Sequence, residues 1–239
     1  MRPVQIGLLV TGRGEAKFAP DLLRALGCGF TVIYRFDQLP PIPSRTKLLR
    51  MVGTGKLLED KEGKIGLMAA AYLRTEGHFA ILIDDLEHHR RPQAETLFAR
   101  YRTALHSNLG DSWKFRASVH FFVNMIEAYY FADASAINDA LGLQLEDHAG
   151  DVEEIRHPKN DLKRLKKDFK EIDDAREIVR RLDLGRVLAD PDTCASLRTL
   201  AKWCCRASGR TPDGRFQLER GRLNPLTAGQ IDALPEPAT

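Results

Sequence analysis

The chain has 239 residues, of which 43% are hydrophobic and 29% charged, and a formal net charge of +3 at pH 7. This composition suffices for a hydrophobic core and excludes a wholly disordered chain, and no apolar run is long enough for a helix that spans a membrane. The first residues have the pattern of a strand rather than of a signal peptide, so we expect a cytoplasmic protein without membrane contacts.

The charges are distributed unevenly along the chain. Residues 156 to 222 contain 18 Lys and Arg against 11 Asp and Glu. A basic region of this kind suits a polyanionic partner, although solvated basic helix faces give the same surplus. The four cysteines form no C-x-x-C pair, so we expect reduced, packed thiols rather than a zinc site.

Strands and helices are expected to alternate in the first half of the chain. Short apolar runs rich in β-branched residues predict strands at 4–11, 30–36, 79–83 and 117–123. Apolar residues at helical spacing predict helices between them at 15–26, 64–75 and 91–106. A Pro-rich loop at 37–44 with basic residues after it follows the second strand. Because such alternation forms parallel sheets, we predict an α/β fold with a parallel sheet of about four strands flanked by helices.

Only helices are expected after the last strand. Apolar spacing predicts them at 158–169, 174–182 and 192–206, and the last residues contain several Pro and Gly. We therefore divide the chain into an α/β domain at 1–140, a helical C-terminal extension at 141–210 and a peripheral tail at 211–239.

Acidic residues follow three of the predicted strands: Glu15 after the first, Asp84, Asp85 and Glu87 after the third, and Glu127 after the fourth. The carboxyl ends of parallel strands share one edge of a sheet, so these side chains can converge. Clustered carboxylates repel one another, and Mg²⁺ or Mn²⁺, which prefer oxygen ligands, would hold them together and activate water for attack on a phosphodiester. A solvated acidic turn is the alternative for the D-D-x-E motif alone.

Basic residues surround an apolar helix face after Pro158. These residues, which can track a phosphate backbone or form a solvated helix face, are Lys159, Lys163, Arg164, Lys166 and Lys167. Histidines and aromatic residues also have two interpretations each. His88, His89 and His120 can bind phosphate or a transition metal, or be ordinary surface histidines, and Tyr129-Tyr130 can stack bases or pack in the core.

Three segments carry a resemblance to a known family. L-L-V-T-G-R-G-E-A-K-F, I-L-I-D-D-L-E and N-M-I-E-A-Y-Y-F-A-D, followed by P-K-N-D-L, occur in this order between Val4 and about Leu165. With them the chain resembles the TOPRIM-like domain, a small doubly wound metal-binding fold. It is similar in particular to a family of uncharacterised bacterial proteins that includes the AriB-type effector nucleases of phage-defence systems.

The resemblance implies a Mg²⁺- or Mn²⁺-dependent nuclease with an ATPase partner. It assigns catalytic roles to Glu15, Asp85 and Glu127, and places metal ligands at Glu15, at the Asp84-Asp85 pair and at Glu87. The family carries a glutamate before the first glycine, in a V-E-G-x-T-E pattern, where this chain has Thr11. A threonine hydroxyl can coordinate Mg²⁺ but cannot act as a base near neutral pH.

Three functions are therefore compatible with the sequence. The first is a Mg²⁺-dependent hydrolase of nucleic-acid phosphodiesters, acting as a defence effector. The second is a catalytically degenerate TOPRIM-like module that binds nucleic acid or a partner protein. The third is a small-molecule phosphotransfer enzyme, which leaves the basic helices unexplained. A homodimer is a further expectation.

Overall fold

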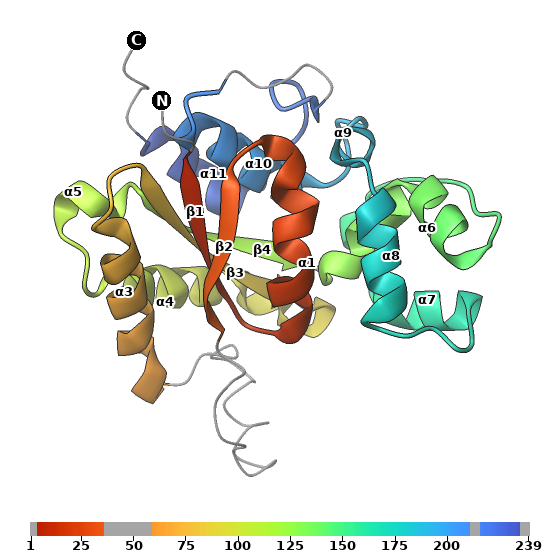
Figure 1. The fold of residues 1–239 in the computed structure, drawn as a ribbon, viewed down its shortest axis with the longest axis horizontal. Coiled ribbons are helices and arrows are strands. Elements are labelled where there is room, and N and C mark those ends of the chain that lie inside the picture. Colours follow the sequence, from red (N-terminus) through yellow and green to blue (C-terminus); the bar gives the residue numbers. More distant parts are fainter. Residues whose placement is uncertain (1–3, 36–58, 211–215, 235–239) are drawn as a thin grey trace.

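A parallel sheet lies at the centre of the computed structural model, which describes residues 4–35, 59–210 and 216–234. Its strands are β1 (Gln5–Val10), β2 (Gly29–Arg35), β3 (His78–Leu86) and β4 (Ala117–Val123), in the order β2-β1-β3-β4 (Figure 1). The central strands are apolar on both faces, as strands covered by helices on both sides must be. The predicted α/β class with a four-stranded parallel sheet is confirmed, and it is consistent with a TOPRIM-like fold.

Helices cover both faces of the sheet (Figure 1). One face packs against α1 (Arg13–Leu23) and α10 (Ala195–Ala207), and the other packs against α3 (Glu59–Leu73) and α4 (Ala94–His106). Residues that alternate along a strand point to opposite faces, so Ile81 and Ile83 join the first core and Leu82 joins the second. The predicted helices of this half are thus present.

The C-terminal helices extend the first of these cores. The other α-helices of the described residues are α5 (Asp111–Lys114), α6 (Ala134–Leu141), α7 (Pro158–Leu165), α8 (Asp173–Arg181), α9 (Leu184–Val187) and α11 (Pro225–Asp232). Short 3₁₀ segments lie between several helices, among them Ile126–Ala132 and Val152–Glu154. Buried residues of α8, α10 and α11 belong to the same cluster as those of β1 and α1. The helical extension predicted at 141–210 therefore shares its core with the sheet.

The last helix differs from the peripheral tail expected at 211–239. Helix α11 packs against α10 and the edge strand β4, and Gln230 is buried there. Its Oε1 accepts a hydrogen bond from the Val119 N–H at 2.9 Å, and its Nε2 donates to the Val119 carbonyl at 2.8 Å. Pro225 is compatible with this helix because it occupies the first turn, where a proline N–H is not needed.

Some predictions lie outside the described residues, namely the Pro-rich loop at 37–44 and the basic residues Arg45, Lys47, Arg50 and Lys56. In the described part of the chain, no helix combines the length and the apolar character that crossing a membrane requires.

Candidate acidic site at the carboxyl edge of the sheet

Four acidic side chains are buried where β1, β3 and β4 end. Glu15 lies in the first turn of α1, Asp84 and Asp85 lie within β3, and Glu127 lies in the 3₁₀ segment after β4. All four are less than 7% exposed. The acids that the sequence placed after three strands, Glu87 apart, are therefore buried along the same edge of the sheet.

The turn after β4 has an uncommon backbone that brings Glu127 back to this edge. Asn124 and Met125 have φ values of 56° and 81°, a region that residues with side chains seldom adopt. Asn124 is anchored there, because its Nδ2 donates to the Glu153 carbonyl at 2.7 Å. Backbone strain of this kind is often found where a fold positions a side chain for function.

Strand β3 is longer than predicted, and this separates the two aspartates. The ladder to β4 continues through Asp84 and Asp85, which pair with Phe121 and Phe122. Neighbouring residues of a strand point to opposite faces, so the two carboxylates do not act as one pair.

Asp84 is held by three side chains. Its Oδ2 accepts hydrogen bonds from Arg90 Nη2 at 2.6 Å and from the Tyr101 hydroxyl at 2.7 Å, and its Oδ1 accepts from the Thr11 hydroxyl. Burial alone would lower the pKa of Arg90, but Asp84 and Tyr101 raise it above the ordinary value, so the guanidinium stays charged. These bonds engage both oxygens of the carboxylate, and its position is that of a structural group.

Thr11, the residue before the first glycine after β1, bridges two acids. Its Oγ1 lies 3.0 Å from Glu15 Oε1 and also contacts Asp84 Oδ1. A hydroxyl has one proton and can donate to only one of these oxygens at a time. The other contact brings two oxygens together, and a proton or a cation at this point would stabilise it.

The remaining acids, Glu15, Asp85 and Glu127, form what we call the acidic centre. Burial raises the pKa of Glu127, the Lys159 ammonium opposes this rise, and the charge of Glu15 adds to it. The charges of Glu127 and Asp85 likewise raise the pKa of Tyr130, after a larger effect of burial.

Lys159 is the cation that faces the acidic centre. Its Nζ lies 3.5 Å from Glu127 Oε1 and 3.7 Å from Glu171 Oε2. Burial lowers the pKa of Lys159, but Glu127, Glu171 and Asp85 raise it above the ordinary value. Lys159 was predicted to bind nucleic acid, and its position beside three carboxylates indicates a role in the centre itself.

The fit of a metal ion to the centre rests on Glu127. Its Oε2 is buried and accepts no hydrogen bond from the described residues. This oxygen and the shared Thr11 contact suit a cation. Over residues 4–35, 59–210 and 216–234, however, no group of three or more His, Cys, Asp or Glu side chains has the arrangement of a formed metal site. Of the predicted ligands, Glu15 and Asp85 lie in the acidic centre.

Glu87, the last predicted ligand, lies apart from the centre. Its side chain is 31% exposed, and Oε2 lies 3.4 Å from His89 Nδ1. The other histidine singled out from the sequence, His120, is fully buried between β4 and α10, where its ring packs against Trp203 with 6.0 Å between ring centroids. Tyr129 and Tyr130 are also fully buried and present no aromatic face for stacking.

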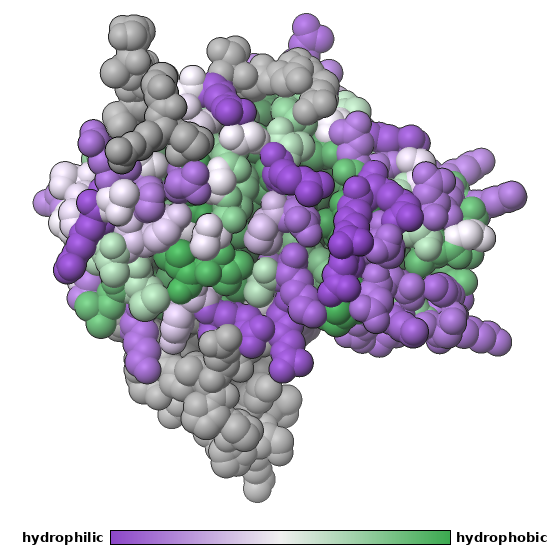
Figure 2. All heavy atoms as spheres, viewed as in Figure 1, coloured by the Kyte–Doolittle hydropathy of each residue, from purple (hydrophilic) through white to green (hydrophobic). Residues whose placement is uncertain are grey.

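The basic residues of α7 and the turn after it are mostly neutralised. Lys163 Nζ lies 2.6 Å from Glu171 Oε1, Arg164 Nη1 lies 2.7 Å from Asp161 Oδ1, and Lys166 Nζ lies 3.0 Å from Asp174 Oδ1. Lys167 is exposed. Figure 2 shows a hydrophilic surface over α7 and α8, where these ion pairs engage Lys163, Arg164 and Lys166.

A cavity of about 870 Å³ beside this edge was not found from the sequence. Its floor includes Leu86 and Val123 at the ends of β3 and β4, and its walls include the first residues of α4, α10 and α11. Its lining contains two ion pairs, Arg91 with Glu154 at 2.8 Å and Arg222 with Asp151 at 2.8 Å. The lining residues come from positions 86 to 226, so no local motif marks them.

The cavity also contains Glu153, the most perturbed acid of this region. Burial, and then the neighbouring Asp151, raise its pKa to about 7. Its Oε1 accepts hydrogen bonds from the Tyr129 hydroxyl at 3.0 Å and from the Ser196 N–H at 2.8 Å. Glu153 therefore titrates near neutral pH at the wall of a cavity.

Comparison of the chain with models of protein families, with curated proteins and with solved structures gave no match.

Proposed function

We propose that the protein is a divalent-metal-dependent hydrolase of nucleic-acid phosphodiesters, with its active site at the acidic centre. The observation that carries this proposal is the burial of Glu15, Asp85 and Glu127 at three strand ends along one edge of the sheet, with a buried Glu127 oxygen that accepts no hydrogen bond from the described residues. These three carboxylates are the residues that would hold Mg²⁺ or Mn²⁺. When bound, the ion would supply positive charge to a phosphate and an activated water.

The side chains around the centre have complementary roles in this proposal. Lys159 is charged and lies close enough to Glu127 to oppose the rise in the pKa of that carboxyl, and it can also contact a phosphate oxygen. Burial keeps the Tyr130 hydroxyl protonated, so it can donate a hydrogen bond to an oxygen in the centre. Thr11 orients Glu15 through its hydroxyl.

A second candidate is a non-catalytic module that binds nucleic acid or a partner protein. The observation in its favour is that the Thr11 hydroxyl, at the position of the family's glutamate, bonds to Asp84, which Arg90 and Tyr101 also hold. In this candidate the edge of the sheet retains buried polar bonds without chemistry. A cytoplasmic location, an ATPase partner and a homodimer stay parts of either proposal.

A nuclease assay with matched variants distinguishes the two candidates. The purified protein is incubated with plasmid DNA, single-stranded DNA and RNA in the presence of Mg²⁺ or Mn²⁺. We expect cleavage that falls by at least about 100-fold in Asp85→Asn and Glu127→Gln, as for loss of a metal-binding side chain. Glu87→Gln is the matched control and should keep wild-type cleavage, because its side chain lies apart from the centre.

Two results would decide against the hydrolase. One is the lack of cleavage of every substrate with either ion, together with no heat of Mn²⁺ binding in calorimetry. The other is cleavage that Asp85→Asn and Glu127→Gln leave unchanged. In both cases, binding of nucleic acid at low salt would favour the second candidate.

A further inference from the structure

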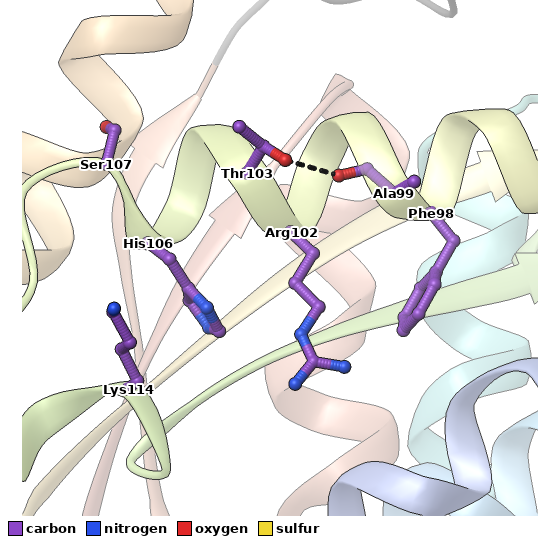
Figure 3. A pocket seen from close by; sticks show the side chains of 7 residues that line it. All are labelled: Phe98, Ala99, Arg102, Thr103, His106, Ser107 and Lys114. Carbon is purple, nitrogen blue, oxygen red and sulfur yellow. Dashed lines mark hydrogen bonds between the residues drawn. The ribbon is translucent and has the colours of Figure 1, made fainter. Parts of the chain in front are cut away.

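A basic groove without any acidic side chain runs along the outer face of α4. It has a volume of about 510 Å³ and is lined by Phe98, Ala99, Arg102, Thr103, His106, Ser107 and Lys114. Figure 3 shows the side chains of Phe98, Arg102 and His106 extending from the same side of α4, with the Lys114 side chain of α5 in the same lining. The groove differs in this respect from the cavity at the carboxyl edge, whose lining includes four carboxylates.

Arg102 supplies a positive charge that the described residues leave uncompensated. Its guanidinium carbon lies 6.0 Å from the centroid of the Phe98 ring, and no carboxylate of the described residues lies within ion-pair distance of it. Lys114 bonds to Asp111 at 2.8 Å, but Asp111 is 96% exposed and does not line the groove. On α7, by contrast, Lys163 and Arg164 each have a carboxylate partner.

The surroundings of the His106 ring indicate that the groove is positively charged. Its Nε2 is buried and has no hydrogen-bond partner among the described residues. Burial lowers the pKa of His106, Arg102 and Lys114 lower it further, and a hydrogen bond to the Ala117 backbone raises it. The groups that face this ring are thus two cations and a backbone carbonyl, and an anion in the groove would stabilise the protonated ring.

We propose that this groove binds the phosphate backbone of a single-stranded nucleic acid. A guanidinium can bind phosphate oxygens in a bidentate manner, and an ammonium adds a second positive charge beside it. Phe98 provides an aromatic ring next to these charges, and such pairing of basic and aromatic side chains is typical of single-strand binding surfaces. The choice of a polynucleotide rests on the proposed function.

The direction of α4 connects the groove with the carboxyl edge of the sheet. Ala94 and Glu95 at the start of α4 line the cavity at that edge, and Arg102 lies seven residues after Glu95, about 10 Å along the helix axis. Tyr101, adjacent to Arg102, reaches through to Asp84. The groove therefore lies about two helical turns along α4 from the cavity at the carboxyl edge.

The test is binding of a fluorescein-labelled oligothymidine strand, measured by fluorescence anisotropy in EDTA at several salt concentrations. The test variant is Arg102→Gln with Lys114→Gln. The matched control is Lys163→Gln with Arg164→Gln, which removes the same charges from α7. For a single strand, each lost phosphate contact lowers the slope of log affinity against log salt by about 0.7. We expect a slope lower by about 1.4 in the groove variant and wild-type binding in the control.

Protonation of His106 gives a second readout. Wild-type affinity should rise between pH 7.5 and pH 6, and His106→Gln should lose this dependence. Wild-type binding by the groove variant, or no binding of the strand by the wild-type protein, would overturn the inference. Because EDTA prevents metal-dependent cleavage, the outcome is independent of the hydrolase assay. If the Asp85→Asn protein binds the strand but does not cleave it, the groove proposal is retained. If the groove variant has wild-type binding and cleavage, only the hydrolase proposal is retained.

Discussion

Arg90 and Asp84 form a fully buried ion pair, with 2.6 Å between Nη2 and Oδ2 and side chains no more than 1% exposed. The desolvation of two such charges costs free energy, which the pair regains only when its remaining hydrogen bonds are satisfied. Here Arg90 also donates to the Asp85 carbonyl at 2.9 Å, and Tyr101 donates to Asp84. The pair thus joins the end of β3 to the 3₁₀ segment His88–Gln93, and Tyr101 joins Asp84 to α4.

Removal of Arg90 should destabilise the fold strongly. Arg90→Met leaves Asp84 buried without its cation, so we expect the free energy of unfolding to fall by about 3–5 kcal/mol. Urea denaturation at neutral pH measures this loss. Arg176→Met is the matched control, because Arg176 pairs with Asp173 on an exposed helix face, and it should unfold as the wild-type protein does. Equal midpoints for the two variants would contradict the assigned role of Arg90.

Loss of Lys159 should change the titration of Glu127. The ammonium 3.5 Å away lowers the pKa of Glu127 and opposes the effect of burial, so Lys159→Met should raise that pKa further. Titration of the Glu127 carboxyl carbon by NMR measures it. Lys163→Met, which removes an ammonium bound to Glu171 instead, should leave the Glu127 titration nearly unchanged. If the Lys159→Met protein has the wild-type Glu127 titration, the Lys159 ammonium does not lie beside Glu127 in solution.

His120 should make the protein less stable in acid. Burial lowers its pKa from 6.5 to about 3, so below pH 6.5 the unfolded chain binds a proton that the folded protein does not. The contribution of His120 to stability therefore falls as pH decreases from 6.5 toward 3, by up to about 1.4 kcal/mol per pH unit. His120→Phe removes the titrating ring and should lose this slope. Stability curves from urea unfolding at a series of pH values provide the measurement, and identical slopes in both proteins would contradict the prediction.

Glu153 should have the opposite effect. Its pKa is raised from 4.5 to about 7, so the folded protein keeps a proton that the unfolded chain has lost. Stability then falls as pH rises from 4.5 to 7 and levels above it. Between about pH 4.5 and 6.5 the effects of His120 and Glu153 cancel, so the wild-type profile should be flat there. In Glu153→Gln, stability should fall with decreasing pH over this range, because only the effect of His120 remains. A flat profile in this variant would contradict the prediction that the two effects cancel.

The strands were predictable because their signals are local. The apolar run at 117–123 gave the bounds of β4 directly, since every residue of that strand is buried. The end of β3 was not predictable in the same way. Asp84 and Asp85 read as the residues that stop a strand, but their backbone partners Phe121 and Phe122 continue the ladder. The separation of the two carboxylates to opposite faces follows from this longer strand.

The candidate site was predictable in part. That Glu15, Asp85 and Glu127 would lie along one edge of the sheet follows from parallel topology, and all three are buried there, while their convergence on one ion and their catalytic and metal-binding roles stay predictions. The surroundings of the basic helix were not predictable from periodicity. Glu171 and Asp174 lie eight residues after Lys163 and Lys166, and they reach them only because the chain turns between α7 and α8.

The amide of Gln230 occupies the hydrogen-bonding groups that β4 would offer to a further strand. Through its two bonds to Val119, this side chain takes the place of the peptide group of a neighbouring strand and blocks strand pairing at that point of the sheet edge. The closure depends on a helix near the C-terminus, far in sequence from the strand that it protects. A chain shortened before α11 would keep every strand yet present an open, apolar template for β-augmentation. We expect a chain without α11 to self-associate while its sheet is still folded.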